Sequence, residues 1–167
     1  MRRRLAAALT AAMLALTAPL LSGCAQNLVL EQQLFFEGGW VKSAEAGGMT
    51  GVFGTLQNGG DDDLTIESAE SDAAETVELH EITAAGVMQQ IDGEVVIPAK
   101  GSYELAPGAN HIMLMGLTND LKAGDSVTVT LHLSDGSSQL LIALVKDYAG
   151  ANEEYHGSEA HDEHAGH

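Results

Sequence analysis

Short segments in which apolar and polar residues alternate recur along this chain from about residue 49 onward, and clusters of Gly, Asp and Asn separate them. Alternation with a period of two is typical of a strand with one buried face, and no long stretch has the three-to-four spacing of an amphipathic helix. Many short strands joined by turns predict an all-β domain, folded as a sandwich or barrel. The expected strands are Thr50–Leu56, Leu64–Ala69, Thr76–Ile82, Val87–Ile91, Glu94–Ile97, Ser102–Leu105, His111–Leu117, Ser126–Leu133 and Gln139–Val145.

Residues typical of turns lie between these segments. Asp135-Gly136 separates two strongly alternating runs and therefore predicts a tight hairpin. A further strand is expected earlier in the chain, around Phe35, Phe36, Trp40 and Val41. Because aromatic residues make up only 4% of the chain, the core must consist mainly of Val, Leu, Ile and Ala.

The first residues have the pattern of an export signal rather than of the domain. Three arginines at positions 2–4 precede an uncharged apolar run over residues 5–21, which ends in the small residues Ser22-Gly23 and then Cys24. Leu21-Ser22-Gly23-Cys24 resembles the lipobox of bacterial lipoproteins, which implies cleavage before Cys24 and diacylation of Cys24. Two or more acyl chains give stable anchoring. We therefore expect a signal peptide over residues 1–23, a tether over 24–34, a β domain over 35–149 and a lipid anchor on the extracytoplasmic side of the cell membrane.

Charge and cysteine content exclude several functional classes. The chain has 7 Lys or Arg and 24 Asp or Glu, so its formal net charge is −17, and removal of the three leading arginines makes it −20. So acidic a chain is repelled by phosphate backbones, and nucleic acid is not expected as a partner. A single cysteine excludes a disulfide framework, a zinc site of several thiolates and redox chemistry with a cysteine pair.

Potential metal ligands share one face of the strand expected at residues 111–117. Alternation places His111, Met113 and Met115 on one side and Ile112 and Leu114 on the other. A lone methionine is usually core filler, but here the aliphatic residues already supply the opposite face. Thioether sulfur is a soft ligand that favours Cu(I), so imidazole together with thioethers points to an exposed copper(I) site.

A second group of candidate ligands lies upstream. In the strand around residue 80, the apolar Leu79 faces one way, which leaves His80 and Glu78 on the other side as surface residues. Met88 follows a short loop and could fold back toward His80. His132 continues the polar face of its own strand and is interpreted as a solvated residue.

The last eighteen residues, 150–167, have almost no apolar side chains and carry four histidines among five acids. This composition is typical of a segment that is disordered without a ligand. Imidazole and carboxylate suit Cu(II) or zinc, so the tail is a possible second metal site; a solvated acidic tail is the alternative. The candidate ligands there are His156, His161, His164 and His167.

Several of these segments together resemble the periplasmic copper chaperones of the PCuAC family. The resemblance covers most of residues 40–148, and it is most specific in the His-x-Met-x-Met-Gly-Leu run that begins at His111. It implies a cupredoxin-like Greek-key β-barrel or sandwich that binds Cu(I) and delivers it to a cuproprotein. The implied recipient is the copper centre of a haem-copper cytochrome c oxidase, with a thioredoxin-like assembly factor as a further partner. The segments that carry the resemblance are Val77–Glu81, Gly86–Met88, Ile97–Gly101, Leu105–Gly108 and His111–Leu117.

The resemblance implies His80, Met88, His111 and Met113 as ligands, with one departure from the family pattern. The family usually has ten residues between the first His and the Met, whereas seven separate His80 from Met88. Either Met88 moves into the site or Met115 completes it, and we favour Met88.

Other functions remain as alternatives. An electron-carrying blue-copper site needs a thiolate, which the only cysteine, at the expected lipidation site, does not supply. An enzyme would use His80 or His111 as a base beside an acid such as Glu81 or Asp120, but no nucleophile motif or phosphate loop supports it. A structural or adhesive envelope lipoprotein, and a Cu(II)- or zinc-scavenging lipoprotein acting through its tail, are the remaining alternatives.

Overall fold

The computed structural model describes residues 33–149, which form ten β-strands and no helix. None of these residues therefore belongs to a helix that could cross a membrane. The strands are β1 (Leu34–Lys42), β2 (Met49–Asn58), β3 (Leu64–Glu70), β4 (Ala74–Ile82), β5 (Met88–Gln90), β6 (Val95–Ile97), β7 (Ser102–Leu105), β8 (His111–Leu117), β9 (Ser126–Leu133) and β10 (Ser138–Lys146).

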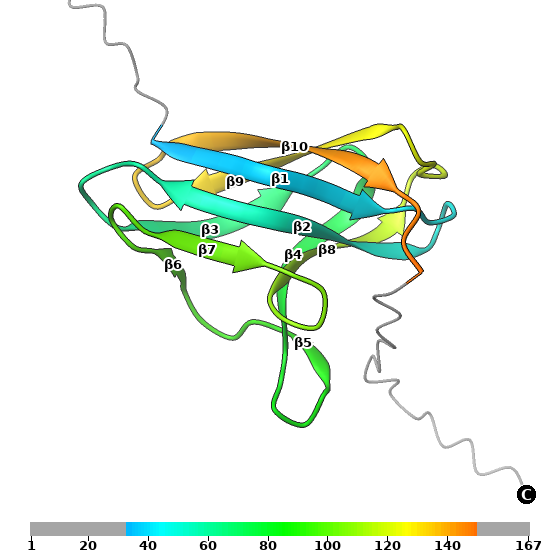
Figure 1. The fold of residues 1–167 in the computed structure, drawn as a ribbon, viewed down its shortest axis with the longest axis horizontal. Helices are drawn as coiled ribbons and strands as arrows, with labels where there is room; N and C mark the ends of the chain where they lie inside the picture. Colours follow the sequence, from blue (N-terminus) through cyan, green and yellow to red (C-terminus); the bar gives the residue numbers. More distant parts are fainter. Residues whose placement is uncertain (1–32, 150–167) are drawn as a thin grey trace, which may run out of the picture. The chain divides into compact units, whose positions relative to one another are not determined.

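The strands join in one curled sheet, in the order β5-β4-β8-β2-β1-β10-β9-β3-β6 (Figure 1). β2 pairs with β8 through its first half and with β7 through its second half, so the sheet divides at this strand. β1 and β10 pair in parallel, whereas the other pairs are antiparallel. The predicted all-β class is confirmed, and each predicted strand is present.

The core lies on the inner side of the curled sheet and is aliphatic, as the composition predicts. Alternate residues of neighbouring strands line up there: Val41 is opposite Val52, and Val52 is opposite Ile112. All three are fully buried. Full burial of a Val or Ile side chain stabilises the folded state by about 1.5–3 kcal/mol relative to leaving it exposed. Burial of these alternate residues determines which face of each strand is turned to the core. The residues that lie between them in the sequence point outward.

A bulge in β1 decides which way Trp40 points. The pairing of β1 with β2 shifts between Glu37 and Trp40, where Gly38 has a φ of 64°. An extra residue in a strand reverses the in-and-out order of the residues beyond it. Glu37 and Trp40 therefore both lie on the outer face, although three positions separate them, and Trp40 stands beside Phe53.

The predicted hairpin at Asp135-Gly136 joins β9 to β10. Gly136 has a φ of 79°, a conformation that glycine adopts without steric cost. Asp135 closes the turn because its Oδ1 accepts hydrogen bonds from the backbone N–H of Ser137 at 2.9 Å and from its hydroxyl at 2.6 Å. These two hydrogen bonds hold the pKa of Asp135 below its ordinary value.

Candidate metal centre

Two histidines lie directly opposite each other on the outer face of the sheet. His80 of β4 is the register partner of His111 of β8, and their ring centroids are 5.9 Å apart. Their neighbours Leu79 and Ile112 are also paired and turn to the inner side, which sets the direction of both imidazoles. A zinc–imidazole bond measures about 2.0–2.1 Å, and with bonds of this order the centroid separation leaves room for one ion between the two rings.

Hydrogen bonds define the tautomer of each neutral ring. His80 Nε2 lies 2.9 Å from Glu78 Oε2, and His111 Nδ1 lies 2.9 Å from the carbonyl oxygen of Ala109. Carboxylate and carbonyl oxygens accept, so these two nitrogens donate. The lone pair of each neutral ring is then on the other nitrogen, His80 Nδ1 and His111 Nε2. Metal-binding histidines commonly have this arrangement, with one N–H donated to a carboxylate or backbone carbonyl.

Thioethers lie on both sides of the histidine pair along the same face. Met113 is two residues beyond His111 and is paired with Glu78, while Met88 is paired with Ile82, two residues beyond His80. Both methionines are buried, each 4% exposed. The register therefore places Met88, the histidine pair and Met113 in one row.

Met115 lies farther along this row, and it has a partner that the sequence did not predict. It is paired with Met49 at the start of β2, and Met49 is 44% exposed. The strand predicted from the sequence begins at Thr50 and leaves Met49 outside it, whereas β2 begins at Met49. Met115 is separated from His111 by Met113, so Met88 and Met113 are the thioethers next to the histidines in register.

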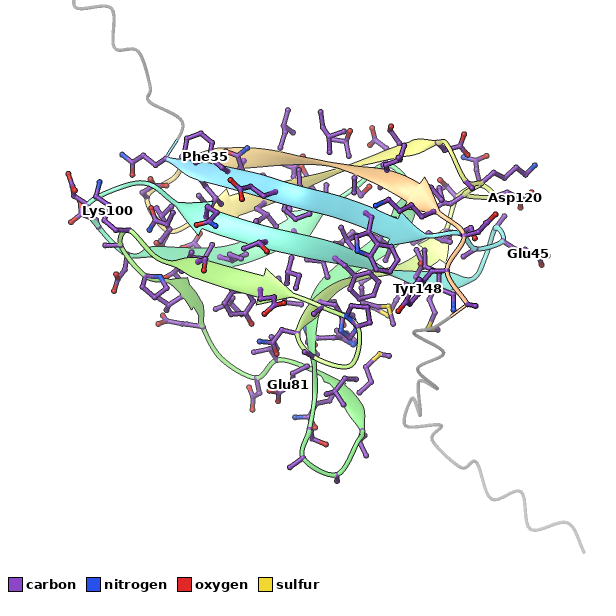
Figure 2. The ribbon with its side chains drawn as sticks, viewed as in Figure 1. Phe35, Glu45, Glu81, Lys100, Asp120 and Tyr148 are labelled. Carbon is purple, nitrogen blue, oxygen red and sulfur yellow. The ribbon has the colours of Figure 1, made fainter. Side chains whose placement is uncertain are left out.

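An aromatic group borders the site at His111. Phe53 lies 6.0 Å from the His111 ring, Trp40 lies 4.6 Å from Phe53, and Tyr148 lies 5.1 Å from Trp40, all between centroids. Figure 2 shows Tyr148 where the described chain leaves the last strand. The Lys146 ammonium is 6.0 Å from the Trp40 ring. Gly51 makes room for this group because a Cβ there would lie 2.5 Å from the Phe53 ring. No spacing of residues in the sequence indicates these contacts.

The expectation of an exposed site is wrong. His80 is 1% exposed and His111 0%, although both occupy the outer face of the sheet. β8 and β5 lie on either side of His80, with Met88 and Met113 along the row and Phe53 beside His111. Both imidazoles are thus buried within the sheet surroundings, which strand alternation alone does not reveal.

The remaining candidate residues lie elsewhere. His132 of β9 is half-exposed, as expected of a surface residue. Its Nε2 lies 3.3 Å from Glu70 Oε1, and its Nδ1 forms a hydrogen bond with the Ser138 hydroxyl. Cys24 and the four tail histidines lie outside the described residues. Over residues 33–149, no three side chains of His, Cys, Asp or Glu gather in one place.

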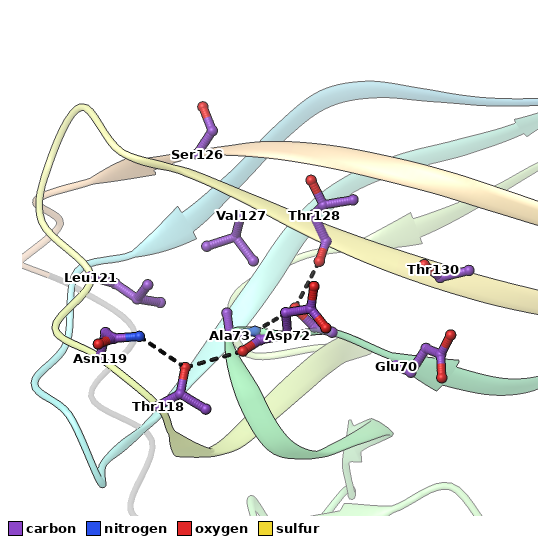
Figure 3. Close-up of a pocket in the computed structure, with 11 residues that line it drawn as sticks. Glu70, Asp72, Ala73, Thr118, Asn119, Leu121, Ser126, Val127, Thr128 and Thr130 are labelled. Atoms are coloured by element: carbon purple, nitrogen blue, oxygen red, sulfur yellow. Dashed lines mark hydrogen bonds between the residues drawn. The ribbon is translucent and has the colours of Figure 1, made fainter.

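A separate pocket of about 580 Å³ lies beside β9 and contains neither histidine nor methionine (Figure 3). Ser71 donates a hydrogen bond to the Thr128 carbonyl at 2.7 Å, and Thr118 donates to the Asp72 carbonyl at 3.1 Å. These bonds fasten the turn between β3 and β4.

Comparison with known proteins identifies the family. The family model described as "Putative lipoprotein LpqE-like" matches residues 34–144. The chain belongs to the LpqE-like family. "Putative lipoprotein Lxx21020" of Leifsonia xyli is 40% identical over 148 residues, which cover 82% of this chain and 89% of that protein.

Solved structures of a PCuAC domain and of DR1885 have the same fold as this LpqE-like protein. The apo PCuAC domain from PmoF1 has a TM-score of 0.59 at 18% identity, covering 70% of this chain and 95% of that one. The solution structure of CuI-DR1885 from Deinococcus radiodurans has a TM-score of 0.55 at 29% identity, covering 72% and 85%. The predicted cupredoxin-like fold is confirmed.

Proposed function

We propose that this LpqE-like protein is an extracytoplasmic copper chaperone of the PCuAC type that binds Cu(I) as its cargo. The observation that carries the proposal is the register pairing of His80 with His111, between Met88 and Met113 in one row. Two imidazoles and two thioethers suit the soft Cu(I) ion. CuI-DR1885, at 29% identity, is a relative whose name states the same oxidation state.

The ligand set is suited to carrying an ion and passing it on. All four ligands are neutral, so none contributes the strong bond of a thiolate. Met88 is on β5, an edge strand of three residues that pairs only with β4. Edge segments with few neighbours open at low free-energy cost. Met88 is therefore the ligand that an incoming donor would displace first.

We further propose a lipid anchor at Cys24 and delivery of copper to a haem-copper cytochrome c oxidase. The anchor is supported by the lipobox-like sequence and by membership of a family described as lipoproteins. The recipient rests on the resemblance to PCuAC proteins. In this scheme the protein is a carrier and not an enzyme.

One observation favours a second function. Met88 and Met113 are each 4% exposed, which also fits thioethers that only fill space in a structural envelope lipoprotein. In that case copper would bind no more tightly to the domain than to an unrelated acidic protein.

A titration of Cu(I) against a chromophoric chelator separates the two functions. We expect one tightly bound Cu(I) per chain, and its loss in His111→Ala and in Met113→Ala. His132→Ala is the matched control, since His132 is a strand histidine outside the row, and it should bind as the unaltered protein does. Unchanged Cu(I) affinity in both site variants would refute the chaperone and leave the structural function.

A further inference from the structure

β10 lies inside the sheet, between β1 and β9, yet it turns three large aliphatic side chains to solvent. Leu140, Ile142 and Leu144 are 59%, 68% and 46% exposed. Phe35, on the outer face of the neighbouring β1, is 46% exposed. We call these four residues the β10 face. Leu140, Ile142 and Leu144 follow one another on one face of β10, and a continuous row of exposed apolar side chains marks an interaction site more often than single exposed residues do.

Charge sets this part of the sheet apart from the rest of the chain. The sequence has 24 acids, but β9 and β10 contain none and β1 contains only Glu37. Two lysines, Lys42 and Lys146, are register partners at one end of β1 and β10. By contrast, β3 and β4 carry Glu67, Glu70, Glu75, Glu78 and Glu81. Among the strands that the structure describes, those of the β10 face are thus the ones that an anionic surface repels least.

We propose that the β10 face rests on the lipid bilayer to which the protein is anchored. The inference depends on the Cys24 anchor of the proposed function. Ten residues lead from Cys24 to Leu34, and a chain of ten residues spans at most about 36 Å. The tether enters the domain at the start of β1, next to Phe35, so it joins the domain at this face.

A short tether makes a weak apolar contact sufficient. Linking a surface to the membrane raises its effective concentration there, and no high intrinsic affinity for lipid is needed. Apolar side chains then enter the headgroup boundary while Lys42 and Lys146 favour anionic headgroups.

This orientation leaves copper transfer unobstructed. In Figure 1, β10 runs along one long edge of the domain, and the hairpin of β4 and β5 projects from the opposite edge. That hairpin carries His80 and Met88. With the β10 face on the bilayer, the edge ligand Met88 is turned toward proteins above the membrane.

A fluorophore at one engineered cysteine tests the contact, because the native Cys24 sulfur carries the lipid. The probe is the environment-sensitive dye NBD at Thr128→Cys, since Thr128 is exposed and is the register partner of Ile142. The control position is Glu81→Cys, on the hairpin (Figure 2). The lipidated protein is reconstituted in phosphatidylglycerol–phosphatidylethanolamine vesicles, and Cys24→Ser protein without vesicles is the reference.

We expect NBD emission at position 128 to rise about twofold on the vesicles and to shift to shorter wavelength, with no change at position 81. Leu140→Gln combined with Ile142→Gln should abolish the rise while the protein stays anchored and its thermal unfolding is unchanged, since both side chains are exposed.

Three outcomes overturn the proposal in different ways. Emission at position 128 equal to that of the reference, in protein that floats with the vesicles, refutes the contact and leaves the anchor intact. A rise that depends on the number of proteins per vesicle assigns the β10 face to a second copy of the chain. Failure to float with the vesicles removes the anchor and this inference together.

Discussion

The His80 and His111 imidazoles face each other across two antiparallel strands, with ring centroids 5.9 Å apart and almost no exposed surface. Two polar rings in such a position are held by hydrogen bonds to Glu78 and to the Ala109 carbonyl. The pair is therefore oriented before any ion arrives. Such preorganisation would lower the entropic cost of binding an ion, and it would make the residues that orient the pair as important as the proposed ligands.

Glu78→Gln should weaken Cu(I) binding by about 10–100-fold, the usual effect of losing a partner of a metal-binding histidine. The amide can present either an oxygen or an NH₂ to His80 Nε2, so the tautomer is no longer fixed. Competition with a Cu(I) chelator measures the effect. Glu81→Gln is the control, because Glu81 accepts a hydrogen bond from the Gln89 amide and not from a histidine. Equal affinity in both variants would mean that Glu78 has no role in orienting His80.

X-ray absorption of the Cu(I) form should distinguish Met88 from Met115 as ligand. We expect Met88→Leu to remove one sulfur neighbour of copper and Met115→Leu to remove none, because Met88 is adjacent to the histidine pair in register and Met115 is not. Leucine has a similar volume to methionine and keeps the packing. The reverse result would place Met115 in the site.

Gly51→Ala should destabilise the domain by about 1–3 kcal/mol, because its Cβ would overlap the buried Phe53 ring that lies beside His111. Urea unfolding gives the change in the free energy of unfolding. In a Phe53→Leu background, Gly51→Ala should lower the free energy of unfolding clearly less, because the smaller leucine side chain leaves room for the added Cβ. Additive effects of the two substitutions would contradict this explanation.

Deletion of residues 151–167 should remove binding of Cu(II) and zinc and preserve binding of Cu(I). The tail offers imidazole and carboxylate, whereas the row in the domain offers imidazole and thioether. Isothermal titration calorimetry with Cu(I), Cu(II) and zinc measures the binding of each ion to the full-length and shortened chains. Loss of Cu(I) binding together with Cu(II) binding would show that the two sites are not independent.

The sequence predicted most of the fold because its signals were local. Alternation and turn residues located the strands, and the residues on each side of β8 follow directly from period two. The family resemblance implied His80, Met88, His111 and Met113 as ligands, and two-residue steps in the register place these four residues near one another on the outer face.

Burial and partners of the site could not be predicted in the same way. Alternation assigns His80 to the outer face, but only the pairing of β4 with both β8 and β5 reveals that this face is covered there. Phe53 of β2 lies beside His111, and Trp40 of β1 packs against Phe53. Both strands are far from β8 in the sequence. Their contribution depends on strand order, which no single segment encodes.

The bulge in β1 changes which residues of this strand face outward. Before the bulge the odd-numbered residues face outward, as Phe35 does, and after it the even-numbered residues do, as Trp40 does. Loss of a single glycine here would leave every strand in place and yet exchange Trp40 with Val41 between solvent side and core. The aromatic border of the candidate metal centre thus depends on the number of residues in the bulge. Insertion or deletion of one residue at Gly38-Gly39 should therefore be far more harmful than a single substitution there.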